Sequence, residues 1–113
     1  MAKTKVFISI PMYGREDEDI DRERASIMQF LSDIVGECEE VPSHFRQEYA
    51  KKLKPLECLG MSIELMSHSD VIVFAPGWEE ARGCRIEHEC AVQYGYSVID
   101  LSDGQYESKL GEN

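Results

Sequence analysis

Two runs of apolar residues constrain the fold of this chain most strongly. Lys5–Ile10 is apolar at nearly every position and stops at Pro11, as expected for a strand that is buried on both faces of a sheet. Val71–Ala75 is the strongest strand signal in the chain and ends at the turn Pro76–Gly77. Runs of this kind predict a sheet that is covered by helices on both sides.

Three helical segments are expected around these strands. The first, Glu16–Val35, has apolar residues near the i, i+3, i+4 and i+7 spacing, and these are Ile20, Ile27, Phe30, Leu31 and Ile34. The second spans about residues 48–67 and is interrupted at Pro55; its apolar stripe is Leu56, Leu59, Ile63 and Met66. The third is expected over Ala81–Tyr94, with Gly95 as its stop.

Shorter segments complete the order of elements. We expect a short strand over Glu39–Pro42, a loop over Ser43–Gln47 and a last strand over Ser97–Leu101. The alternation of strands and helices predicts one three-layer α/β domain over residues 1–101, with a mostly parallel sheet of four to five strands, flavodoxin- or Rossmann-like. We expect residues 102–113 to form a polar tail.

Composition excludes several classes of function. The net charge of −10 argues against binding to duplex DNA or RNA, which needs a basic patch. No apolar run is long enough for a membrane span, and the first residues lack a signal-peptide pattern, so we expect a cytoplasmic protein without membrane contact. The four cysteines include no CxxC pair, and we expect free thiols and no metal site.

Glu87 is the most informative single residue. On a helix, its neighbours at i−4, i−3, i+3 and i+4 are all small: Gly83, Cys84, Cys90 and Ala91. Small neighbours leave room beside the carboxylate for a ligand. Parallel sheets bind ligands at the carboxyl ends of their strands, which here lead into the loops Pro11–Arg15 and Pro76–Glu80.

Several stretches together resemble the nucleoside 2-deoxyribosyltransferase superfamily. They are Lys5–Arg15, Ser69–Phe74 and Gly83–Glu87. Within the superfamily, the chain is most similar to a small, often phage-borne family of uncharacterised proteins. That family typically carries the Pro-Gly-Trp turn and the Arg-Gly-x-x-x-Glu-His-Glu stretch that are present here at Pro76–Trp78 and Arg82–Glu89.

The resemblance implies chemistry at the N-glycosidic bond of a 2′-deoxynucleoside or a deoxynucleoside 5′-monophosphate. Glu87 matches the nucleophile that attacks C1′, expels the base and forms a glycosyl-enzyme ester, which a second base or water then resolves. Tyr13 is expected to orient the carboxylate or the sugar, and Asp70 to support the site. The resemblance implies no metal or organic cofactor, and a homo-oligomer, a dimer or larger.

The two loops are expected to bind the substrate. Ser9, Gly14 and Arg15 would hold a 5′-phosphate through a hydroxyl, loop amides and a guanidinium. Trp78 would stack on the base, and Arg82 would bind a phosphate or carboxylate. The remaining positions expected to contact the substrate are Pro11, Met12, Gly77 and Gly83.

Structural alternatives remain open for these residues. Asp70 also fits a strand-opening acid, Trp78 a lid that packs on its own domain or a partner subunit, and His88 a packed histidine. Arg15 and Arg82 are otherwise surface charges.

Two departures from the superfamily pattern keep other functions open. Ala81 stands six positions before Glu87, where transferases usually have an acid or a serine, and Ser62 stands near the place of a usual Asp. Glu79 or Glu80 could replace the first of these groups. The departures favour an alternative, a nucleotide-binding or sensor module that keeps the pocket without turnover. A purely structural oligomerisation domain is the third hypothesis.

Overall fold

The computed structural model describes residues 3–42 and 47–101. Strands and helices alternate along the chain as the sequence predicts. In chain order the elements are β1 (Thr4–Ser9), α1 (Asp17–Val35), β2 (Cys38–Glu40), α2 (Gln47–Ala50), α3 (Pro55–Met66), β3 (Val71–Phe74), the 3₁₀ turn η1 (Trp78–Glu80), α4 (Arg82–Gln93) and β4 (Ser97–Asp100).

The strands of the described ranges form one parallel sheet with the order β2-β1-β3-β4. Val6 of β1 is paired with Glu40 of β2 on one side and with Val71 of β3 on the other. Val71 is also paired with Ser97 at the start of β4. The prediction of a three-layer α/β domain with a parallel sheet is therefore confirmed, with four strands.

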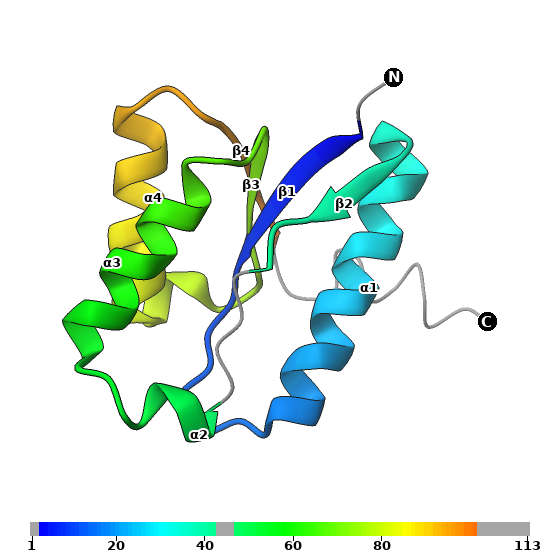
Figure 1. Ribbon diagram of the computed structural model, residues 1–113. Coiled ribbons are helices and arrows are strands. Elements are labelled where there is room, and N and C mark those ends of the chain that lie inside the picture. Colours follow the sequence, from blue (N-terminus) through cyan, green and yellow to red (C-terminus); the bar gives the residue numbers. More distant parts are fainter. Residues whose placement is uncertain (1–2, 43–46, 102–113) are drawn as a thin grey trace.

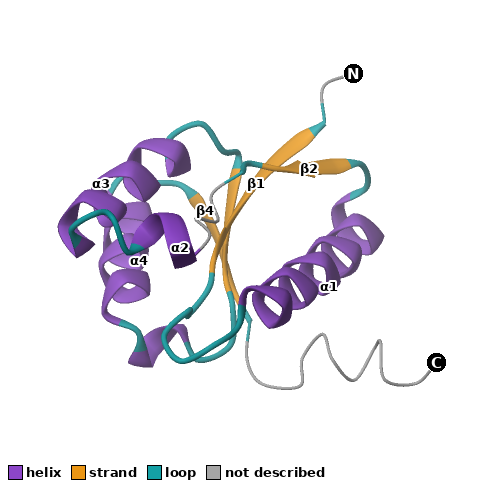
Figure 2. Cartoon of the chain, turned by 60° about the horizontal axis from the view of Figure 1, so that its bottom comes forward, coloured by secondary structure: helices purple, strands orange, loops and turns teal. Residues whose placement is uncertain are grey.

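The helices lie on both faces of this sheet. α1 covers one face, and α3 and α4 cover the other (Figure 1). Figure 2 shows the same separation in another view. Right-handed crossovers explain it, because the connection from β1 to β2 runs toward one edge of the sheet and the later connections run toward the other. The direction changes beside β1.

Alternating side chains of β1 supply the two hydrophobic clusters of the core. Val6 and Ile8 of β1, and Ile10 just after it, pack in the cluster under α1, whereas Phe7 of β1 packs in the cluster on the α3 and α4 side. Successive residues of a strand point to opposite faces. Ser9 therefore points to the α3 and α4 side, although the segment around it is apolar.

Some element boundaries differ from the predicted ones. β2 is Cys38–Glu40 rather than Glu39–Pro42, and Pro42 has no N–H to continue a ladder. The second helical region is two helices, and Pro55 begins the second of them, a position where its missing N–H is not needed.

Two residues of the predicted apolar stripes lie outside the core. Leu56 in the first turn of α3 is 77% exposed, and Ile34 in the last turn of α1 is 57% exposed. Both are near helix ends that extend beyond the clusters. Most of the predicted loop at 43–47 and the whole predicted tail at 102–113 lie outside the described residues. Within the described ranges, no helix combines the length and hydropathy that a membrane span needs.

Candidate functional site

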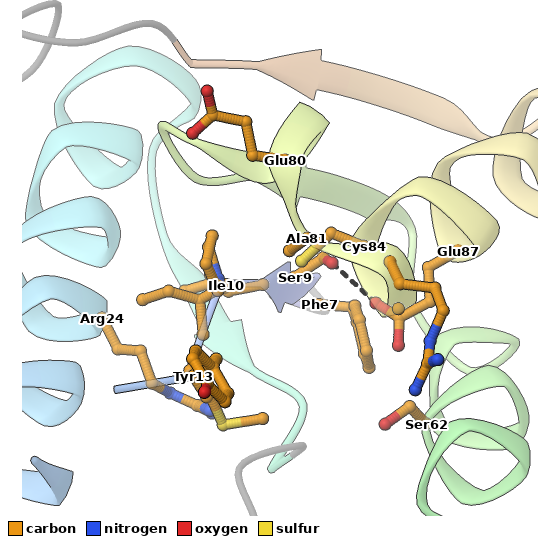
Figure 3. Close-up of a pocket in the computed structure, with 15 residues that line it drawn as sticks. Phe7, Ser9, Ile10, Tyr13, Arg24, Ser62, Glu80, Ala81, Cys84 and Glu87 are labelled. Carbon is orange, nitrogen blue, oxygen red and sulfur yellow. Dashed lines mark hydrogen bonds between the residues drawn. The ribbon is translucent and has the colours of Figure 1, made fainter. Parts of the chain in front are cut away.

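A cavity of about 450 Å³ opens beside the carboxyl end of β1. Its wall is built from the end of β1 and the loop after it, one residue each of α1 and α3, and the segment from Glu80 to Glu87 (Figure 3). The cavity therefore lies where the direction of strand connections changes, which is the usual position of ligand sites in open α/β sheets.

Glu87 and Ser9 form the polar centre of this cavity. Glu87 lies in the second turn of α4 and is only 8% exposed. The Ser9 hydroxyl, at the last residue of β1, donates a hydrogen bond of 2.6 Å to Oε1 of Glu87 (Figure 3). Because the two residues are 78 positions apart in the sequence, packing of α4 on the sheet makes this contact.

The surroundings of Glu87 raise the pKa of its carboxyl group to the neutral range. Burial raises the pKa of Glu87 to about 7, and the hydrogen bond from Ser9 acts in the opposite direction because it favours the ionised form. Both protonation states are therefore populated near neutral pH. A carboxyl group in this range can act as a nucleophile, a base or an acid.

Cys84 lies one turn before Glu87 and lines the same cavity. Burial raises the pKa of its thiol to about 11, hydrogen bonding with Ser9 lowers the pKa, and the charge of Glu87 raises it. At neutral pH Cys84 is therefore an unreactive thiol in the cavity wall. All four cysteines are free in this structure.

The small neighbours of Glu87 leave room on one side only. Gly83 and Cys84, toward the amino end of α4, line the cavity. Ala91 and Cys90, toward the carboxyl end, pack in the cluster on the α3 and α4 side. The open space predicted beside Glu87 is thus present around the first turn of its helix.

The loop after β1 lines the cavity, but not with the two loop residues, Gly14 and Arg15, that were predicted to hold a phosphate. Pro11, Met12 and Tyr13 line the cavity, but Tyr13 is fully exposed and lies away from Glu87 in Figure 3. Gly14 closes a turn with φ +76 and is not part of the cavity wall. Tyr13 is therefore at the mouth of the cavity rather than beside the carboxylate.

Arg15 holds this loop in place. Its guanidinium donates to the Pro11 carbonyl at 2.9 Å and forms an ion pair of 2.7 Å with Glu23 of α1. Arg15 does not line the cavity. These two contacts fix the loop against α1, which is a structural role.

Asp70 is not brought to Glu87. It precedes β3 and accepts a hydrogen bond of 2.8 Å from the Lys5 backbone N–H. Since the strands are parallel, Asp70 lies at the amino ends of the strands and the cavity lies at their carboxyl ends. Its observed contact is that of a strand-opening acid, so its predicted support of Glu87 is not met by this geometry.

Trp78 packs on its own domain. Its ring stacks on the His88 ring, with the two ring centroids 4.0 Å apart, and its centroid lies 5.5 Å from that of the Phe74 ring. His88 in turn contacts Asp100 at 3.0 Å. Trp78 is not in the cavity wall, so the structure does not place it over a bound base.

Gly77 and Arg82 lie on either side of η1. Gly77 has φ +88 and approaches Pro11 but does not line the cavity, whereas Arg82 does line it, from the exposed first position of α4.

Several residues of the cavity wall had no predicted role in the site. Ser62 and Ala81, the two departures from the superfamily pattern, both line it. Arg24 also lines it, from α1. Its signal was available, because Arg24 follows Ile20 by four positions and precedes Ile27 by three, and so shares their buried face.

No metal centre is evident at residues 3–42 and 47–101, where no group of three or more His, Cys, Asp or Glu side chains is placed to hold an ion.

Comparison with known families places the chain in one of them. Residues 4–100 match the model described as "Domain of unknown function (DUF4406)". The chain belongs to the DUF4406 family. The match runs from β1 to β4 and therefore includes both Ser9 and Glu87. Comparison with curated proteins and with solved structures gives no match.

Proposed function

We propose that this DUF4406 domain cleaves or transfers the N-glycosidic bond of a 2′-deoxynucleoside or deoxynucleoside 5′-monophosphate. The observation that carries the proposal is the buried Glu87 carboxylate, which Ser9 holds at the wall of a cavity of about 450 Å³. This volume is in the range of small-molecule sites. The resemblance of Gly83–Glu87 to the nucleophile motif of the nucleoside 2-deoxyribosyltransferase superfamily supports the same chemistry.

In the first step, Glu87 attacks C1′ of the deoxyribose. Ser9 occupies Oε1, so Oε2 is the attacking atom in this proposal. The bond from C1′ to Oε2 forms while the bond from C1′ to the base nitrogen breaks, and the base leaves with that electron pair and takes up a proton. The hydrogen bond from Ser9 favours the ionised carboxylate that the attack requires.

In the second step, water or another base attacks C1′ and the ester bond to Oε2 breaks. The attacking group loses its proton, and Glu87 returns to its free form. Glu80 is the other carboxyl residue of the described cavity wall. Figure 3 shows its carboxylate directed away from Glu87, so solvent or a reoriented Glu80 supplies the proton of the first step.

A panel of deoxynucleosides and their 5′-monophosphates, assayed for free base, tests this proposal. Base release is expected with the wild type and not with Glu87→Gln. Glu89→Gln is the matched control, because Glu89 is an exposed glutamate of the same helix that hydrogen-bonds Gln93. Mass spectrometry should detect a deoxyribosyl ester on the peptide that contains Glu87. Base release that survives in Glu87→Gln would rule out the nucleophile.

A nucleotide-binding module without turnover is the second candidate. Ala81 stands where the superfamily usually has an acid or a serine, and Ser62 stands near the place of a usual Asp. Both line the cavity without supplying those groups, which favours this candidate. It predicts a rise in melting temperature with nucleotide and no base release. A ligand at about 100 times its Kd adds about 2.7 kcal/mol to the free energy of unfolding, so binding is readily detected. No shift with any nucleotide would leave only the structural hypothesis.

A further inference from the structure

Arg24 places a buried positive charge in the wall of the cavity. It is 7% exposed and lies on the inner face of α1, yet it lines the same cavity as Glu87. In Figure 3, Arg24 reaches in from α1 and Glu87 from α4, on opposite sides of Ser9. An arginine stays charged at any physiological pH, so the cavity has a permanent cation on the wall opposite its carboxylate.

An ion pair orients this cation. Arg24 pairs with Glu40 of β2, which ties α1 to the edge of the sheet next to β1. A carboxylate partner reduces the cost of burying a guanidinium. It also holds the side chain in place before any ligand arrives, so that less side-chain entropy is lost on binding.

The other arginines near the cavity are placed differently. Arg15 lies outside the cavity wall and binds Pro11 and Glu23. Arg82 lines the wall but is exposed, and it lies on the same helix as Glu87. Arg24 is thus the buried arginine of the described wall, and it lies across the cavity from the proposed nucleophile.

We propose that Arg24 receives the anionic end of the substrate, which makes the substrate a deoxynucleoside 5′-monophosphate rather than a deoxynucleoside. C1′ would lie at Glu87 and the phosphate at Arg24, so the two ends of one ligand would contact opposite walls. A guanidinium binds phosphate oxygens through parallel charge-assisted hydrogen bonds. The identity of sugar and base rests on the proposed function, whereas the preference for a phosphate is a property of the cavity itself.

Binding measurements on matched ligands test this assignment. Each deoxynucleoside and its 5′-monophosphate are titrated calorimetrically into the Glu87→Gln protein, which prevents turnover. The monophosphate is expected to bind about tenfold more tightly or better, since it adds charge-assisted hydrogen bonds to the guanidinium. The preference should disappear with Arg24→Gln added and decrease with Arg24→Lys.

Arg22→Gln is the matched control, because Arg22 is an exposed arginine of α1 that pairs with Asp19. It should leave the preference unchanged. If Arg24 had a purely structural role, its loss would weaken the binding of both ligands equally. An unchanged ratio of the two Kd values in the protein with Arg24→Gln therefore overturns the assignment. If the protein with Arg24→Gln does not fold, the assignment is overturned instead by an equal ratio of nucleoside to monophosphate Kd in Glu87→Gln alone and in Glu87→Gln with Arg24→Lys.

The test also separates this inference from the proposed function. A preference for monophosphate without base release by the wild-type protein contradicts the proposed reaction alone. Base release without a preference for monophosphate contradicts the role of Arg24 alone.

Discussion

At the scale of single residues, Glu87 is held in a state that costs the folded protein stability. Its pKa is about 7 in the folded protein against an ordinary pKa of 4.5 for glutamate. Between these values the folded protein keeps a proton that the unfolded chain releases. Stability therefore falls as the pH rises through this window, and the loss is complete above pH 7.

The variant Glu87→Gln should consequently be more stable than the wild type at alkaline pH. Glutamine keeps the size and the acceptor for Ser9 but carries no charge to bury. We expect a gain of up to about 3 kcal/mol in the free energy of unfolding near pH 8 and little change near pH 4. Urea unfolding at both pH values measures it. A gain that is independent of pH would show that the buried charge is not its cause.

Ser9→Ala should raise the pKa of Glu87, because the hydrogen bond from Ser9 lowers it. Without the hydroxyl, the effect of burial is unopposed and the pKa of Glu87 rises further. The acidic limb of the base-release profile should move to higher pH, with kcat/KM lowered roughly tenfold below the pKa. Ser9→Thr, which keeps the hydroxyl, is the control. An unchanged pH profile in Ser9→Ala would show that the hydrogen bond does not set this equilibrium.

At the scale of elements, the turn between β3 and α4 determines where Glu87 enters the cavity. Gly77 has φ +88, a conformation that costs about 1 kcal/mol or more for other residues. A Cβ at this position would meet Pro11 Cγ at 3.8 Å, an ordinary contact. The requirement for glycine is thus one of backbone conformation rather than of space.

Gly77→Ala is therefore expected to lower the free energy of unfolding by about 1 kcal/mol. Gly60→Ala is the matched control, because Gly60 lies inside α3 with nothing within 4 Å of an added Cβ. That change should raise stability by roughly 0.5–1 kcal/mol through helix propensity. Chemical denaturation of both variants measures the difference, and equal effects of the two would refute the argument from φ.

At the scale of the whole molecule, α1 covers its face of the sheet alone among the described helices. Ile20, Ile27 and Leu31 of α1 are fully or almost fully buried in the cluster with Val6 and Ile8. This packing also places Arg24 in the cavity wall and next to its ion-pair partner Glu40. Stability of the core and geometry of the site are therefore coupled through one helix.

Ile27→Ala should be strongly destabilising for this reason. Removing a fully buried Ile side chain costs about 2–5 kcal/mol through lost burial and the cavity left behind. Ile34→Ala, on the same helix but 57% exposed, should change stability by less than about 0.5 kcal/mol. Thermal unfolding of the pair measures the contrast. A similar loss in both variants would mean that the helix pattern, and not burial, sets the cost.

The order of elements could be predicted from the sequence because it depends on local properties. These properties depend only on neighbouring residues in the chain. They are the apolar run of β1, the helical spacing of Ile20, Ile27 and Leu31, and Pro55 at the start of α3. Even the space near Glu87 could be inferred from the small side chains at Gly83 and Cys84. Leu56 shows the limit, because its place in the helical stripe is local but its 77% exposure depends on what the fold brings near it.

Tertiary structure decided which residues make up the site. Packing of α4 on the sheet joins Ser9 to Glu87, and packing of α1 carries Arg24 into the same wall. The parallel arrangement of strands places Asp70 at the far end of the sheet, and Trp78 stacks on His88 instead of facing the cavity. The sequence by itself therefore determined the alternation of elements and the candidate nucleophile. The residues that surround this candidate nucleophile depended on contacts between residues far apart in the chain, which no local pattern encodes.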